Sequence, residues 1–179
     1  MLRFREFKLC LGILISILAM SSFAGAQQSS LYKYKEAGIQ FVVPAGWKIE
    51  KNKDGSITVS GKDGDSNVLV TMTTFGPETS ALTPKAQFKL FAEGVLPAVR
   101  KDWKEFQSQE PMDVTNMDAG VQMIDQEFKG TKDGVEMDGV VWLLSFDKPV
   151  GLLMQETVNV SGRLDKDRGE LMGSIKKIE

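Results

Sequence analysis

Val140-Val141-Trp142-Leu143-Leu144 decides the fold, because it is apolar at five consecutive positions. Side chains alternate between the two faces of a β-strand, so this stretch presents apolar residues on both. A strand of that kind is covered on both faces, which places it centrally in a sheet with helices on each side. We therefore expect Trp142, together with Trp47, to anchor the core.

Extended patterns and turn signals surround this stretch. Lys132-Asp133-Gly134 and Asn52-Lys53-Asp54-Gly55 have the composition of hairpin turns. Apolar alternation between such turns predicts strands over 39–43, 47–51, 56–60, 67–75, 105–114, 121–129, 135–146 and 150–160.

The clearest predicted helix follows Thr83, which can cap it, and begins at Pro84. Pro97 lies inside this helix and lacks a backbone donor, so we expect a kink or a break near Glu93. A second helix is predicted over 164–175. The fold class is thus α+β: an α/β/α sandwich with a central, mostly antiparallel sheet of seven to eight strands, one inserted helix and one C-terminal helix. The apolar stripe of the first helix comprises Phe88, Phe91, Ala92, Val95, Leu96, Val99 and Trp103.

The N-terminus has the pattern of a secretory signal peptide. Basic residues precede an apolar run over 9–20, and Ala24-Gly25-Ala26 follows it as a small-x-small cleavage site. The run is shorter than the ~20 residues that a bilayer-spanning helix needs. We expect cleavage between Ala26 and Gln27, and therefore a periplasmic or secreted bacterial protein.

Cleavage would leave 153 residues, a common size for one domain. The predicted organisation is a signal peptide over 1–26, a disordered lead-in over 27–30 and a single domain over 31–179. Acids and bases are interspersed, and the mature chain would hold 19 basic and 23 acidic residues. This balance disfavours nucleic acid and anionic membrane surfaces as partners.

Cleavage would also remove Cys10, the only cysteine, from a chain that contains no histidine. A His-based triad, a cysteine nucleophile and a His/Cys zinc site are thereby excluded from the mature chain. Serine–lysine chemistry, carboxylate chemistry and oxygen-ligand metal sites remain.

Two segments match Ser-x-x-Lys, the spacing that places an amine beside a nucleophile on a helix: Ser174-Ile175-Lys176-Lys177 and Ser30-Leu31-Tyr32-Lys33. The Ser-Asp-Asn and Lys-Thr-Gly elements that accompany it in penicillin-recognising enzymes are absent from the sequence. We interpret the first match as a helix end with basic residues that suit the helix dipole.

Carboxylates recur at alternate positions of two predicted strands. Asp125 and Glu127 share one face of their strand, and Glu136 and Asp138 share one face of its hairpin partner. Paired carboxylates can hydrolyse glycosides at a suitable separation, but the strand register is needed to bring the two faces together. We favour a solvated sheet face, with Lys129 paired across the hairpin.

Two further patterns suggest metal binding and have simpler interpretations. Asp63-Gly64-Asp65-Ser66-Asn67 resembles the start of a calcium loop, but the positions that an EF-hand gives to glycine and glutamate hold Val68 and Thr74. A hairpin turn is the better interpretation. Thioether ligands favour copper(I), yet no methionine lies within four residues of another, so we assign the methionines to the core. The seven in the mature chain are Met72, Met112, Met117, Met123, Met137, Met154 and Met172.

Three stretches of the chain resemble the PsbP/DcrB-like superfamily. They are Gly38-Ile39-Gln40-Phe41-Val42-Val43-Pro44-Ala45-Gly46-Trp47, Asp65-Ser66-Asn67-Val68-Leu69-Val70-Thr71 and Leu171-Met172-Gly173-Ser174-Ile175-Lys176. The resemblance implies an α/β/α sandwich and a mostly non-catalytic role, as in extrinsic subunits or assembly factors of photosystem II and in small bacterial envelope proteins. Metal ligation in the photosynthetic members involves histidines, so no functional residue carries over to this chain.

Three functions remain as hypotheses. We favour a non-enzymatic accessory or binding protein that uses no cofactor and acts through an envelope protein partner. A carrier of a small apolar ligand, with a cavity between sheet and helix lined by Met and Phe, is the alternative. A hydrolase that uses Ser174 or paired carboxylates such as Asp125 is the remote one.

Overall fold

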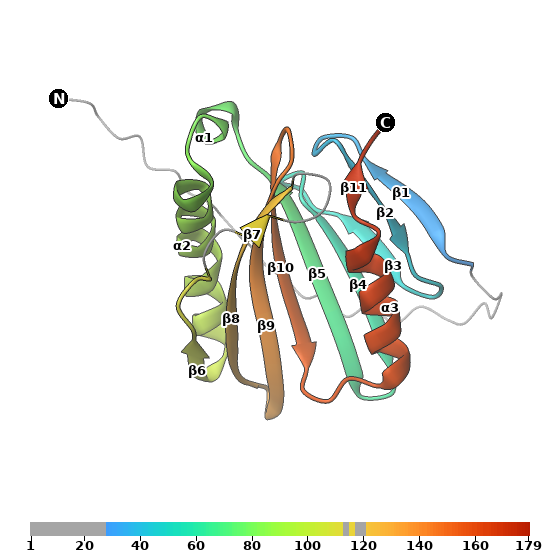
Figure 1. Ribbon diagram of the computed structural model, residues 1–179. Helices are drawn as coiled ribbons and strands as arrows, with labels where there is room; N and C mark the ends of the chain where they lie inside the picture. Colours follow the sequence, from blue (N-terminus) through green and yellow to red (C-terminus); the bar gives the residue numbers. More distant parts are fainter. Residues whose placement is uncertain (1–27, 113–114, 117–120) are drawn as a thin grey trace.

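The computed structural model describes residues 28–112, 115–116 and 121–179, so the predicted cleavage-site residues Ala24, Ala26 and Gln27 lie outside the described part of the chain. The domain holds a large antiparallel sheet, a three-stranded sheet and three helices. Helices α2 (Pro84–Asp102) and α3 (Gly162–Gly173) lie on opposite sides of the large sheet (Figure 1). The predicted α/β/α sandwich is confirmed. None of the helices in the described ranges is long and apolar enough to cross a membrane.

The large sheet has eight strands, and its order is β3-β4-β5-β10-β9-β8-β6, with the short β7 also paired to β8. Every pairing in it is antiparallel. The strand bounds are β3 Lys48–Lys51, β4 Ile57–Asp63, β5 Ser66–Thr74, β6 Lys104–Ser108, β7 Thr115–Asn116, β8 Gln122–Lys132, β9 Val135–Ser145 and β10 Pro149–Thr157.

The most apolar strands occupy the middle of this sheet. All nine residues of β10 are buried, and β10 lies between β5 and β9. In β9, Val141 and Leu143 are fully buried on one face, whereas Trp142 on the other face is only partly buried. The expectation that Trp142 anchors the core is therefore wrong: it packs only at the margin of the core, because α3 packs mainly over β4 and β5. Trp47 does anchor the core, with 4% of its surface exposed.

We expected a kink or a break near Glu93; helix α2 is continuous from Pro84 to Asp102, so it is not broken there. Thr83 caps the helix as predicted, since its hydroxyl accepts a hydrogen bond from the amide of Ala86. The apolar stripe holds the helix against β8, β9 and β10 on either side of the proline. A four-residue helix, α1 (Pro77–Ser80), precedes α2.

The three-stranded sheet was not expected as a separate sheet. Its strands are β1 (Ser30–Tyr34), β2 (Ile39–Val43) and β11 (Lys176–Lys177), in the order β1-β2-β11. It packs with α3 against the large sheet, and its side chains Ile39 and Phe41 are fully buried there. β1 begins at Ser30, the last residue of the predicted lead-in.

Each face of the large sheet is covered over only part of its width. Helix α2 covers β8, β9 and β10 on one face, while Thr58 and Thr71 on the same face of β4 and β5 are partly exposed. On the other face, α3 and the small sheet cover the β4–β5 half, while Glu127 and Lys129 on β8 are exposed. The edges of the covering layers therefore form grooves.

Candidate functional site

Ser174 has a structural role at the end of α3. Its hydroxyl donates a hydrogen bond to the carbonyl of Leu171 at 2.8 Å and accepts one from the amide of Val42 at 2.8 Å. Lys177 lies in β11 and Ser30 lies in β1, so neither Ser-x-x-Lys segment forms the helical turn that would align serine with lysine. The structure thus uses Ser174 to tie α3 to β2.

The carboxylates of β8 and β9 do share one face, as the register of the hairpin now shows. Directly opposite residues are Lys129 with Asp138, which is the register that the predicted pairing of Lys129 across the hairpin requires, and Asp125 with Trp142. Glu127 is exposed and accepts a hydrogen bond from Gln109 Nε2 at 3.0 Å. Asp125 is 8% exposed, and its burial raises the pKa of its carboxyl. None of these four acids therefore lies directly opposite another: Glu127 faces Val140 and Glu136 faces Thr131.

Asp63-Gly64-Asp65-Ser66-Asn67 forms the hairpin turn between β4 and β5, as predicted, with Gly64 at a φ of 58°. Among the residues that the structure describes, no group of three or more metal-ligating side chains comes together. The methionine prediction is confirmed for the buried Met72, Met137 and Met154, whereas Met112 is 58% exposed and Met117 lies outside the described residues.

A groove of about 800 Å³ crosses the uncovered part of the α3 face, and we call it the sheet groove. Val140 and Trp142 on β9, Met154 on β10 and Met172 on α3 give it an apolar wall. Its polar lining comes from Gln107, Ser108, Gln109, Glu127, Lys129, Asp138, Glu156 and Arg168.

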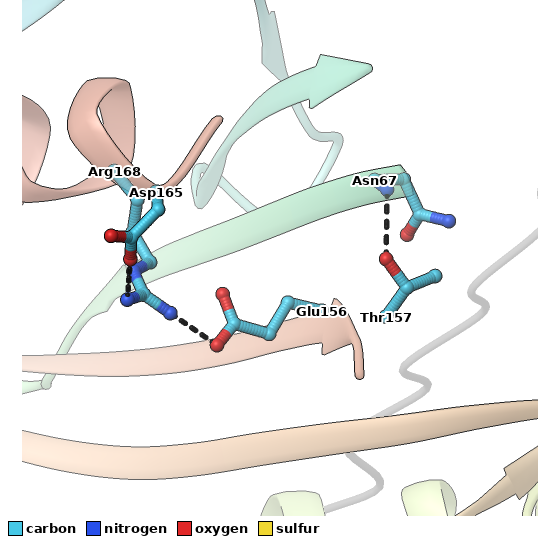
Figure 2. A network of polar contacts seen from close by, with 5 residues as sticks. All are labelled: Asn67, Glu156, Thr157, Asp165 and Arg168. Carbon is cyan, nitrogen blue, oxygen red and sulfur yellow. Dashed lines mark hydrogen bonds and ion pairs between the residues drawn. The ribbon is translucent and has the colours of Figure 1, made fainter. Parts of the chain in front are cut away.

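Arg168 forms the α3 side of the sheet groove and holds two carboxylates (Figure 2). Its guanidinium donates to Glu156 Oε1 and to Asp165 Oδ1, so it links the end of β10 to the first turns of α3. Glu156 is 9% exposed, and its Oε2 has no hydrogen-bond partner among the described residues. In the same region the backbone N–H of Asn67 donates a hydrogen bond to Thr157 Oγ1 at 3.1 Å, and this bond joins β5 to β10.

A second groove, of about 610 Å³, lies between α2 and β8 on the opposite face, and we call it the helix groove. Such a volume is within the usual range for small-molecule sites. Its apolar lining includes the buried Phe88, Ala92 and Ile124 and the exposed Met112. Leu96, Pro97, Pro111 and Gln126 complete the uncharged lining. This position matches the predicted cavity between sheet and helix.

Among the residues that the structure describes, the charged lining of the helix groove comes from α2. Lys85, Lys89 and Arg100 supply three positive charges, and Glu93 supplies one negative charge. Lys89 Nζ lies 3.9 Å from Glu93 Oε1, one helical turn away. The Arg100 guanidinium lies over the ring of Phe106, 5.1 Å from its centroid.

Glu127, Lys129 and Asp138 of the sheet groove were singled out from the sequence, whereas Glu156, Arg168 and the charged residues of the helix groove were not. Lys85, Lys89, Glu93 and Arg100 recur at intervals of four and seven, which places them along one side of the apolar stripe of α2. That spacing is a signal that could have found them. Glu156 was detectable as the one acid in a strand that is otherwise apolar or uncharged, whereas its link to Arg168 depends on how α3 docks.

No family model matches the sequence, and no curated protein sequence matches it. Among solved structures, the fold is similar to that of cyanobacterial PsbP from Synechocystis sp. PCC 6803, with a TM-score of 0.54 and 17% identity, over 90% of this chain and 99% of that chain. A second similar structure is LpqN of Mycobacterium tuberculosis, described as involved in cell envelope biogenesis, with a TM-score of 0.47, 12% identity and coverage of 85% and 91%. The similarity to cyanobacterial PsbP confirms the PsbP-like fold implied by the sequence resemblance.

Proposed function

We propose that the protein is an exported, non-catalytic accessory protein of the bacterial envelope that acts by binding a protein partner. The signal-peptide pattern supports export. The PsbP-like fold extends over nine-tenths of the chain, so one binding domain accounts for nearly all of its length. The structural role of Ser174 is consistent with a function in binding.

The sheet groove is the observation that carries this proposal. Tryptophan and arginine are the residues that most often dominate the energy of protein interfaces, where polar contacts surround them. Trp142 lies partly exposed in the wall of the groove, and Arg168 lines its α3 side. Glu127, Lys129 and Asp138 form a mixed-charge rim. A partner segment that covers Trp142 and pairs with this rim would have the composition of a typical interface.

Site-specific photocrosslinking in living cells tests the sheet groove as the partner surface. A photoreactive residue in place of Lys129, at the rim, should give one discrete adduct, and the same residue in place of the exposed turn residue Lys53 should give none. Trp142→Ala should reduce the Lys129 adduct at least several-fold. Because Trp142→Ala also affects packing, Asp138→Lys serves as a second variant that changes only the rim. The proposal fails if both positions give the same adducts, or if neither variant changes the adduct at Lys129.

Export is tested by fractionation and N-terminal sequencing of the mature protein. We expect the envelope or medium fraction to contain a chain that begins at Gln27. Ala24→Leu and Ala26→Leu should retain the precursor, since signal peptidase requires small residues at these positions. A cytoplasmic chain with an intact N-terminus would contradict the export step.

The helix groove favours a second function, that of a carrier for a small apolar ligand. The groove places Phe88, Ala92 and Ile124 beneath the more exposed Leu96 and Met112, so an apolar chain in it would be shielded from water. Burial of apolar surface stabilises such a complex by about 25 cal/mol for each Å² removed from water.

Titration with methyl dodecanoate, a neutral apolar probe, tests the carrier function. We expect saturable binding of one molecule, and loss of binding in Leu96→Trp, which fills the groove. Leu90→Trp is the matched control, because Leu90 lies on the same helix, is 50% exposed and does not line the groove. Absence of binding to the native protein, or equal effects of the two variants, would rule out this function.

A further inference from the structure

Two carboxylates lie side by side at one end of the sheet groove. The register of β9 and β10 places Asp138 directly opposite Glu156, and both residues line the groove. Like charges in this position destabilise a sheet unless a cation lies close to both. Arg168 donates to Glu156 Oε1, but the same guanidinium also holds Asp165, so its one positive charge is shared between two carboxylates. This end of the groove is therefore acidic.

The acidic character remains when every cation of the sheet groove is counted with its partners. The lining holds two cations and three carboxylates, and a fourth carboxylate is bound to one of the cations: Lys129 and Arg168 against Glu127, Asp138, Glu156 and Asp165. Even if both cations are fully paired, a surplus of two negative charges is left. The groove thus has the charge that suits a cationic group.

Glu156 supplies an independent observation that points to a ligand. It is 9% exposed and lines the groove, and its Oε2 is buried without a hydrogen-bond partner among the described residues (Figure 2). An unpaired buried carboxylate oxygen carries a desolvation cost that a hydrogen bond would offset. A cationic donor placed between Glu156 and Asp138 would satisfy this oxygen and would also reduce the repulsion between the two carboxylates.

The neighbouring row of side chains on the same face is apolar. Val140 lies directly opposite Met154, and each is two residues along its strand from one of the two carboxylates. Lysine and arginine combine an apolar stem with a charged end. The stem of such a side chain could pack on Val140 and Met154 while its charged end reaches Asp138 and Glu156.

We propose that the sheet groove binds a lysine or arginine side chain of the partner protein, with its stem on Val140 and Met154 and its charged end at Asp138 and Glu156. This inference rests on the partner function proposed above and names the chemistry of the partner segment at the same site. An acidic segment would add to the surplus negative charge, and an apolar one would leave Glu156 Oε2 unpaired.

Photocrosslinking from position 129, followed by mass spectrometry of the digested adduct, identifies the partner segment in the groove. We expect this segment to contain lysine or arginine. Asp138→Asn and Glu156→Gln, each combined with the photoreactive residue, should lower the adduct yield at least about fivefold, because each removes a charge-assisted hydrogen bond. Asp138 is exposed, so its substitution leaves the fold intact. The control Glu136→Gln removes a charge from an exposed position on the same face of β9 that does not line the groove, and should leave the yield unchanged.

Exchange of charge between the two proteins tests whether the contact is direct. Asp138→Lys should abolish the adduct at position 129. Replacement of the basic residue in the crosslinked segment by glutamate should restore the adduct in the Asp138→Lys variant and weaken it with the native groove. Failure of this exchange to restore the adduct would overturn the direct contact.

The outcomes separate this inference from the partner function on which it rests. A discrete adduct overturns the basic side chain if its segment holds no lysine or arginine, or if Asp138→Asn and Glu156→Gln lower its yield no more than Glu136→Gln does. In either case the partner function stands as long as Trp142→Ala still lowers the yield. The absence of any discrete adduct at position 129 overturns both.

Discussion

At the scale of single residues, the position of Trp47 depends on a glycine. The indole lies against Gly61, where a Cβ atom would come within 2.3 Å of the ring, and its Nε1 donates to Asp167 Oδ2 on α3 at 3.2 Å. One side chain thus packs on β4 and holds α3 at the same time. Trp142 has no comparable enclosure, since one side of its ring faces the sheet groove.

Trp47→Ala should lower the free energy of unfolding by about 3–5 kcal/mol, because a buried aromatic side chain is replaced by a cavity. Chemical denaturation of the mature domain measures this loss. Trp142→Ala should cost clearly less, since its ring is partly exposed. A loss at Trp142 equal to or larger than that at Trp47 would contradict the described burial.

Asp125 makes the stability of the domain depend on pH. Burial raises the pKa of its carboxyl, so the folded state holds this proton more tightly than the unfolded state. The stability associated with the protonated form is present below the ordinary pKa of aspartate and is lost as the pH rises through the raised value.

Asp125→Asn should therefore raise the midpoint of urea denaturation more at pH 7 than at pH 4. Asp138→Asn, on the same face but exposed, is the control and should show little change at either pH. An equal effect of Asp125→Asn at both pH values would show that the burial of this carboxyl does not govern its ionisation.

At the scale of elements, helix α2 shows how packing overrides a local signal. Pro97 predicts an interruption, yet Val95 and Val99 are both buried against the sheet and the helix continues to Asp102. Gly94, in contrast, makes no contact that would require a glycine, because a Cβ atom there would meet no atom within 4 Å. Its effect on α2 is therefore only the cost in conformational entropy.

Gly94→Ala should stabilise the protein by about 0.5–1 kcal/mol. The matched substitution in a strand is Gly139→Ala, where the new Cβ would lie 2.1 Å from the ring of Phe128 and should destabilise by about 1–3 kcal/mol. Thermal denaturation of both variants measures whether each substitution raises or lowers the melting temperature. A destabilising Gly94→Ala would show that the surface of α2 is more crowded than described.

Most helices and strands could be predicted from the sequence, because the spacing of apolar residues and the composition of turns depend only on residues that are close in the chain. The grooves could not, since each is lined by segments that are distant in the chain: Phe88 and Ile124 line the helix groove, and Trp142 and Met172 line the sheet groove. The sequence did predict a cavity between helix and sheet with Phe and Met in its lining. It did not predict the cationic side chains of that lining. Burial of Glu156 under Arg168 depends on the docking of α3, which no local pattern specifies.

At the scale of the whole molecule, the small sheet brings the two ends of the domain together. β11 pairs with β2 through Lys176 opposite Gln40, and the Ile178 amide donates to the carbonyl of Gly38 at 2.9 Å. The sequence does not predict this closure, because a two-residue exposed strand of lysines has no strand pattern of its own.

Truncation after Ile175 should therefore loosen the small sheet and leave the large one intact. Hydrogen exchange should become at least tenfold faster at the β2 amides and stay unchanged in β9 and β10. The double variant Lys176→Ala and Lys177→Ala keeps the backbone of β11, so the β2 amides should exchange as slowly in it as in the native chain. Uniformly faster exchange across both sheets would mean that the ends of the chain support the whole domain.

Strand β8 supplies both grooves with alternate residues, Gln126 to the helix groove and Glu127 and Lys129 to the sheet groove. Deletion of one residue within the strand would turn every later side chain to the opposite face and exchange the two linings. Substitutions in β8 can thus change the lining of one groove at a time, whereas a change in the length of the strand alters both grooves at once. Insertions can accumulate at the Asp133-Gly134 turn, which lies beyond both grooves, so the evolutionary history of β8 should be one of constant length and changing composition.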